Sequence, residues 1–111
     1  MKYAPLILVA LLAGANLPAR AADEGSAAIE AIGKLNGIAL ACQQPALVTR
    51  ARNAVTTIAP KTRANGEIFE NATNAAYLEQ GKGLTCPEAP ALLAQITQAE
   101  TRLQAAFPVA K

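Results

Sequence analysis

Apolar residues recur along this chain at intervals of three and four, the spacing that places them on one side of an α-helix. The pattern covers four segments after residue 22, and we expect each segment to be helical. The first two run from about residue 24 to 42 and from 45 to 58. The third begins at Thr62 or Asn65 and ends at Gln80, and the fourth begins within residues 84–90 and ends near Phe107.

The first two segments have well-defined apolar faces. Gly33 and Gly37 weaken the first as a helix, each by about 1 kcal/mol relative to alanine. Pro45 suits the first turn of the second. The face of the first is Ile29, Ile32, Leu35, Ala39, Leu40 and Cys42, with Glu30 and Lys34 opposite; the face of the second is Leu47, Val48, Ala51, Ala54, Val55 and Ile58.

The third and fourth segments also carry termination and capping signals. Gly81 and Gly83 supply a stop after the third. Thr85 and Glu88 have the spacing of a capping box, or else Cys86 is the cap and Pro87 the first helical residue, and either places Cys86 in the first turn. The face of the third is Ile68, Phe69, Ala72, Ala75 and Ala76; that of the fourth is Leu92, Leu93, Ile96, Ala99, Leu103, Ala106 and Phe107.

One stretch, residues 55–70, has a competing interpretation. Val55 to Ile58 is a β-branched run, and Asn65-Gly66 is a favoured hairpin turn pair. The residues after that pair do not alternate between apolar and polar, as a half-buried strand requires. We therefore expect two helix ends here, with a hairpin as the alternative.

Short connections favour an all-α, up-down-up-down four-helix bundle, in which the first and last helices are neighbours. Cys42 then ends the first helix at the end of the bundle where Cys86 opens the last. We expect these two cysteines to form one intramolecular disulfide, which closes a loop of 44 residues and stabilises the fold by about 4 kcal/mol. A redox-active Cys86 is the alternative, but the chain lacks the close Cys-x-x-Cys pairing of such sites.

The beginning of the chain has the features of a cleaved signal peptide. Lys2 is followed by the apolar run 5–17, and Ala19-Arg20-Ala21 has the small-x-small pattern that signal peptidase reads. About 13 apolar residues are too few to span a bilayer, so an uncleaved anchor is the weaker alternative. We expect residues 1–21 to be a leader, and residues 22–111 to be one helical domain in the bacterial periplasm or secreted, without stable membrane insertion.

Charge and composition narrow the possible functions. The chain has ten basic and eight acidic residues. Because Lys2 and Arg20 belong to the leader, the domain has eight of each and no net charge. A neutral domain lacks the general attraction to nucleic acid that a basic one has, so we expect no nucleic-acid partner. The domain is rich in alanine and has three aromatic residues, Phe69, Tyr77 and Phe107, so its core is thin.

The domain also lacks residues that most catalytic and cofactor sites use. It has no histidine and no methionine, so the usual ligands of haem, di-iron, copper and zinc sites are missing. Catalytic pairs that use histidine are missing too. Glu67 and Glu70 lie one helical turn apart, but both lie away from the apolar face. A carboxylate surrounded by solvent lacks the buried environment that adapts such a group to acid-base catalysis. We expect no enzymatic activity and no cofactor.

Two groups of residues remain as candidate contact surfaces. The first consists of apolar residues off the helix faces, all at the disulfide end: Ile38, Tyr77, Leu78 and Leu84. Exposed apolar clusters with a tyrosine are typical of protein-contact sites, although these residues could instead cover the bundle end. The second is a basic group around residues 50–63, which we expect Asp23 and Glu24 to neutralise: Arg50, Arg52, Lys61 and Arg63.

By elimination, the sequence predicts a non-catalytic, exported helical protein that binds another protein as an inhibitor, an immunity-type partner or an accessory, chaperone-like factor. The alternative is a carrier or sensor of a small apolar ligand held between alanine-lined helices.

Overall fold

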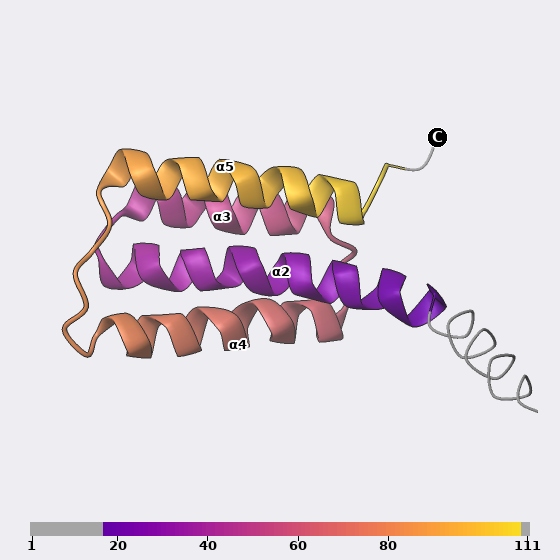
Figure 1. Cartoon of the computed structure of the whole chain (residues 1–111), viewed down its shortest axis with the longest axis horizontal. Helices are drawn as coiled ribbons and strands as arrows, with labels where there is room; N and C mark the ends of the chain where they lie inside the picture. Colours follow the sequence, from indigo (N-terminus) through magenta and orange to yellow (C-terminus); the bar gives the residue numbers. More distant parts are fainter. Residues whose placement is uncertain (1–16, 110–111) are drawn as a thin grey trace, which may run out of the picture.

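The computed structural model describes residues 17–109, with side chains from residue 23 onward. These residues form four helices, α2 (Leu17–Ala41), α3 (Pro45–Ile58), α4 (Arg63–Gln80) and α5 (Ala89–Ala106), and no strand. Figure 1 shows that successive helices run in opposite directions. The protein is therefore a small all-α, up-down-up-down four-helix bundle, as the spacing of apolar residues predicts. The hairpin alternative is wrong, because residues 55–58 end α3 and residues 63–70 begin α4.

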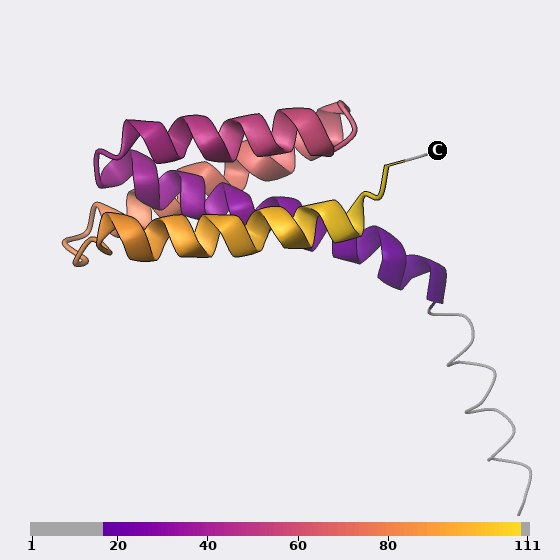
Figure 2. The ribbon, with the colours of Figure 1, turned by 90° about the horizontal axis from the view of Figure 1, so that it is seen from above.

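Helix α2 is the centre of the bundle. The other three helices all pack on α2, and α3 and α5 also pack on each other, whereas the backbone of α4 approaches only α2. In the view of Figure 2, α2 lies between α3 and α5 near the α2–α3 turn and crosses α5 toward its own start. A square bundle would place α2 and α4 diagonally, but here they are the most closely packed pair. The chain thus forms a three-helix unit with a fourth helix attached to its central member.

The close approach of α2 and α4 depends on two glycines. A Cβ atom at Gly33 would lie 2.8 Å from the carbonyl oxygen of Phe69 and 2.9 Å from the Ala72 Cβ. A Cβ at Gly37 would collide with the carbonyl oxygen of Thr73 and lie 2.8 Å from the Ala76 Cβ. Each glycine lowers helix propensity, but its missing side chain is what lets the two backbones meet.

The core consists of two adjacent groups of buried side chains. The larger includes Ile29, Ile32, Ala51, Phe69 and Leu103. The smaller lies nearer the disulfide and consists of Ala39, Leu47, Leu92 and Ile96. Three residues that we expected on the apolar faces are exposed instead: Leu40, Ala75 and Leu93. For Ala75 the reason is that α4 packs on a single neighbour, so its buried face is narrower than that of an inner helix.

The start of α5 differs from our expectation. The helix begins at Ala89, with Glu88 as its N-cap, so Cys86 precedes the helix instead of lying in its first turn. The position of Pro90 explains the shift. If Pro87 were the first helical residue, Pro90 would be the fourth and would need to donate the first intrahelical hydrogen bond, which proline cannot do. With Ala89 first, Leu92 makes that bond, to the Glu88 carbonyl at 3.0 Å.

Side-chain and backbone caps fix two other helix ends. Thr62 caps α4 by accepting a hydrogen bond from the Asn65 amide at 3.1 Å, so Asn65-Gly66 lies inside the first turn. At the end of α2, the Gln44 amide donates to the Ala39 carbonyl and the Gln43 amide to the Leu40 carbonyl. This is the bond pattern of a Schellman motif, in which Gln43 takes the left-handed conformation, with φ of 57°.

Of the expected leader, residues 1–16 lie outside the residues that the structure describes, and residues 17–21 begin α2. Within residues 17–109, no helix combines the length and the apolar character needed to cross a membrane.

Candidate functional site

A disulfide joins the end of α2 to the connection between α4 and α5, which the bundle topology brings together. Cys42 and Cys86 are bonded at an S–S distance of 2.08 Å, with their Cα atoms 5.8 Å apart, so the expected pairing is confirmed. Cys42 is half-buried at the end of α2, and Cys86 is exposed in the connection between α4 and α5, residues 81–88. Both cysteines of the chain are used in this bond. Neither therefore supplies a thiolate in this state.

The connection 81–88 is held at a second point by α4. The side-chain amide of Gln80 donates to the carbonyl oxygens of Leu84 at 3.1 Å and Thr85 at 3.2 Å. Gly83 has a φ of 97°, which only glycine adopts readily, and this lets the chain turn back toward α5. Leu84 is thus fixed between the Gln80 side chain and the disulfide at Cys86.

Large apolar side chains are exposed around this anchored connection. Tyr77 is 48% exposed, Leu78 66% and Leu84 53%. Tyr77 and Leu78 lie in the last turn of α4, and Leu84 is tied to Gln80 of the same turn. We call Tyr77, Leu78 and Leu84 the disulfide-end surface. The fourth residue that we expected there, Ile38, is half-buried and packs against the smaller core group instead.

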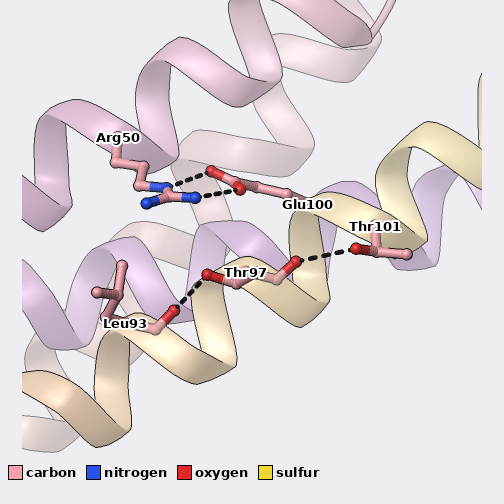
Figure 3. Close-up of polar contacts among 5 residues, drawn as sticks. All are labelled: Arg50, Leu93, Thr97, Glu100 and Thr101. Carbon is pink, nitrogen blue, oxygen red and sulfur yellow. Dashed lines mark hydrogen bonds and ion pairs between the residues drawn. The ribbon is translucent and has the colours of Figure 1, made fainter.

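The basic group is divided between two faces. Arg50 of α3 makes a bidentate ion pair with Glu100 of α5, at 2.8 and 2.9 Å, as Figure 3 shows. This hydrogen bonding and the charge of Glu100 raise the pKa of Arg50 above its ordinary value. Arg52 turns toward α4, where it pairs with Glu70 at 3.2 Å and lies 5.5 Å from the centroid of the Phe69 ring.

The expected neutralisation of this basic group by residues at the start of α2 does not occur through Glu24. Glu24 pairs with Arg102 of α5 at 3.2 Å, because α5 lies along that side of α2. Glu100 and Glu70 neutralise Arg50 and Arg52 instead. Lys61 and Arg63, in and after the turn between α3 and α4, are exposed and form no ion pair with the described side chains. Two cations at this end are therefore unneutralised.

A groove opens beside these two cations, where α3 and α4 diverge. Its volume is about 720 Å³. The apolar part of its wall includes Val55, Ala59 and Phe69, and its polar part contains both the unpaired cations and the Arg52–Glu70 pair. Gly66 also lines it, and a Cβ atom there would meet nothing within 4 Å. The groove lies at the opposite end of the bundle from the disulfide, at the turn that joins α3 to α4.

The two candidate carboxylates lie on the surface of α4. Glu67 and Glu70 are both exposed, and Glu70 is paired with Arg52. Among the described residues, no three histidine, cysteine, aspartate or glutamate side chains form a group that could hold a metal ion.

The sequence analysis missed a polar pair in the tightest helix contact. Asn36 is fully buried, and its side-chain amide donates to the hydroxyl of Thr73 at 3.1 Å. The Thr73 hydroxyl lies 2.8 Å from the Phe69 carbonyl and can donate to it. The sequence contains an indication of this close contact, because Gly33 and Gly37 are four residues apart and Asn36 adjoins them. Helix propensity alone shows only that those glycines weaken the helix.

Comparisons of this chain with protein-family models, with curated proteins and with solved structures find no match.

Proposed function

We propose that this is an exported, non-catalytic protein that binds a partner protein through its disulfide-end surface. The observation that supports this most is the exposure of three large apolar side chains, Tyr77, Leu78 and Leu84, on one anchored segment of a domain with few large apolar residues. Leaving such side chains in water costs free energy that burial in an interface recovers, about 25 cal/mol per Å² of apolar area.

The surface is also preorganised. A backbone segment that is fixed before binding loses little conformational entropy when the partner arrives, and this favours affinity. The backbone at Leu84 is held by the disulfide two residues away and by the hydrogen bond that its carbonyl accepts from Gln80. Tyr77 and Leu78 lie on the last turn of α4, whose backbone is held against Gly37 of α2.

The surroundings of this surface point to an apolar partner. The nearest charged residues in the chain, Glu79 and Lys82, lie 3.5 Å apart as a pair. Because this pair carries no net charge, we expect binding to depend little on salt. Tyrosine contributes a large area and a hydroxyl at low entropic cost, and it is enriched among the residues that dominate interface energy.

The proposal includes an oxidising compartment, periplasmic or secreted. A disulfide between two cysteines 44 residues apart persists where thiols are not kept reduced, and this bond supports an exported location.

The carrier alternative has less support from the packing of the alanine-lined faces. Ala72 and Ala76 lie against Gly33 and Gly37 at distances that leave no space between α2 and α4 for a ligand. Of the two predicted functions, protein binding is therefore the one that the geometry favours.

Site-directed photo-cross-linking in envelope extracts tests the proposal. A photo-reactive phenylalanine analogue at Leu78 is compared with the same analogue at Thr97, which is exposed on α5. We expect one discrete protein adduct from position 78 and none from position 97. Changing Tyr77 to serine in the Leu78 probe should remove the adduct while leaving the melting temperature within about 2 °C. Adducts of equal yield from both positions, or none from position 78, would refute the proposal.

A further inference from the structure

The groove between α3 and α4 has a charge pattern that the protein-binding proposal does not use. Its lining includes three cations, Arg52, Lys61 and Arg63, and two anions, Glu67 and Glu70. Its formal charge is therefore +1, the difference between three and two. Because Glu70 pairs with Arg52, the remaining charges of the lining are the exposed cations Lys61 and Arg63 and one exposed anion, Glu67.

Part of the groove lining is apolar. Val55 is half-buried there, and Phe69 and Ala59 reach the lining from the core with only 5% and 6% of their surface exposed. Arg52 lies over the Phe69 ring and covers part of it, so the apolar surface and the charged rim are adjacent. A site with an apolar wall and a few charged side chains favours a ligand that has both an apolar body and a charged group.

We propose that this groove binds a small amphipathic carboxylate. The single negative charge of the ligand pairs with Lys61 and Arg63, and its apolar body lies along Val55, Ala59 and Phe69. The volume of about 720 Å³ is within the range of small-molecule sites. The amino-terminal end of α4, which begins at Arg63, adds a partial positive charge at the same place.

Gly66 provides a steric test that leaves the fold intact. It lies in the first turns of α4, and open space surrounds the position of a Cβ atom there. Replacing glycine in a helix favours the helix, so Gly66→Trp fills the groove without destabilising α4. Gly66→Ala is the matched control, since it also raises the helix propensity at this position but occupies little of the groove.

The test is a nuclear magnetic resonance titration of the oxidised protein at pH 7, with octanoate and its uncharged amide, octanamide, as probes. We expect octanoate to produce saturable shifts of backbone amides within residues 55–71, and octanamide to bind about tenfold more weakly. Gly66→Trp should abolish the shifts and Gly66→Ala should retain them. Lys61→Gln combined with Arg63→Gln should weaken octanoate binding about tenfold.

Lys34→Gln is the charge control, because Lys34 is exposed on α2 and does not line the groove. It should leave octanoate binding unchanged. The proposal is overturned if octanoate gives no saturable shift, if octanamide binds equally well, or if Lys34→Gln weakens binding as much as the double substitution. Because the cross-linking site is at the opposite end of the bundle, failure here and failure of the protein-binding proposal are separate results.

Discussion

The side-chain amide of Asn36 on α2 donates a hydrogen bond to the hydroxyl of Thr73 on α4, across 3.1 Å, at the closest helix contact in the bundle. Both side chains are buried, and the other oxygen of this pair, Asn36 Oδ1, has no hydrogen-bond partner. A buried polar atom without a partner costs about 1–3 kcal/mol. The α2–α4 contact therefore contains one buried hydrogen bond, which stabilises it, and one buried oxygen without a partner, which destabilises it.

We expect Thr73→Val to destabilise the protein by about 1–3 kcal/mol, because it leaves the whole Asn36 amide without a partner. Asn36→Leu removes the unsatisfied oxygen, and Thr73 keeps its bond to the Phe69 carbonyl, so its effect should be below about 1 kcal/mol. The double variant should be more stable than Thr73→Val alone. Urea unfolding of all four proteins measures this coupling. Simple additivity of the two single effects would contradict it.

Alanine substitutions at Gly37 of α2 and at Gly66 of α4 should change the stability of the protein in opposite directions. Gly37→Ala should cost about 1–3 kcal/mol, because the added methyl group meets backbone atoms of Thr73 and Tyr77 that cannot rotate away. Gly66→Ala should add up to about 1 kcal/mol of stability, since only helix propensity changes. The comparison is made by urea unfolding. Equal stabilities of the two variants would mean that α2 and α4 are not in close contact.

Loss of the disulfide should remove much of the stability of this domain. Replacing Cys42 and Cys86 together with serine should cost about 4 kcal/mol, because a crosslink over 44 residues restricts the unfolded chain. Reduction of the unmodified protein should lower its urea midpoint to the same value. A midpoint that does not change with reductant would show that the bond contributes nothing to stability.

The end of α2 offers a stabilising substitution. Gln43 has a φ of 57°, a conformation that costs a side-chain-bearing residue about 1–2 kcal/mol. Gln43→Gly should therefore stabilise the protein by about 1 kcal/mol and raise its melting temperature by about 4–8 °C. Gln43→Ala keeps the strain and should leave the melting temperature close to that of the unmodified protein. An identical increase in both variants would show that removal of the glutamine side chain, and not relief of strain, is responsible.

Local pattern predicted more of the fold than of the candidate sites. The bounds of α3 and α4 follow from Pro45, the Thr62 cap and the spacing of apolar residues. Helix α5 begins two or three residues later than the two capping registers predict, because Pro90 cannot donate the intrahelical hydrogen bond that either register requires of it. Of the four residues expected at the disulfide end, Ile38 is half-buried, because it packs against the smaller core group, which contains side chains of α2, α3 and α5.

The sequence by itself determined that this chain is helical, that its helices alternate in direction, and that Cys42 meets Cys86. These follow from short-range periodicity, helix capping and the lengths of the connections, which depend on neighbours in the chain. The tertiary structure decided which helix α4 packs on, which arginines are neutralised and where the groove opens. Those outcomes depend on contacts between residues distant in the sequence, chiefly the approach of α4 to Gly33 and Gly37; the spacing of these glycines marks a close helix contact but does not say which helix makes it.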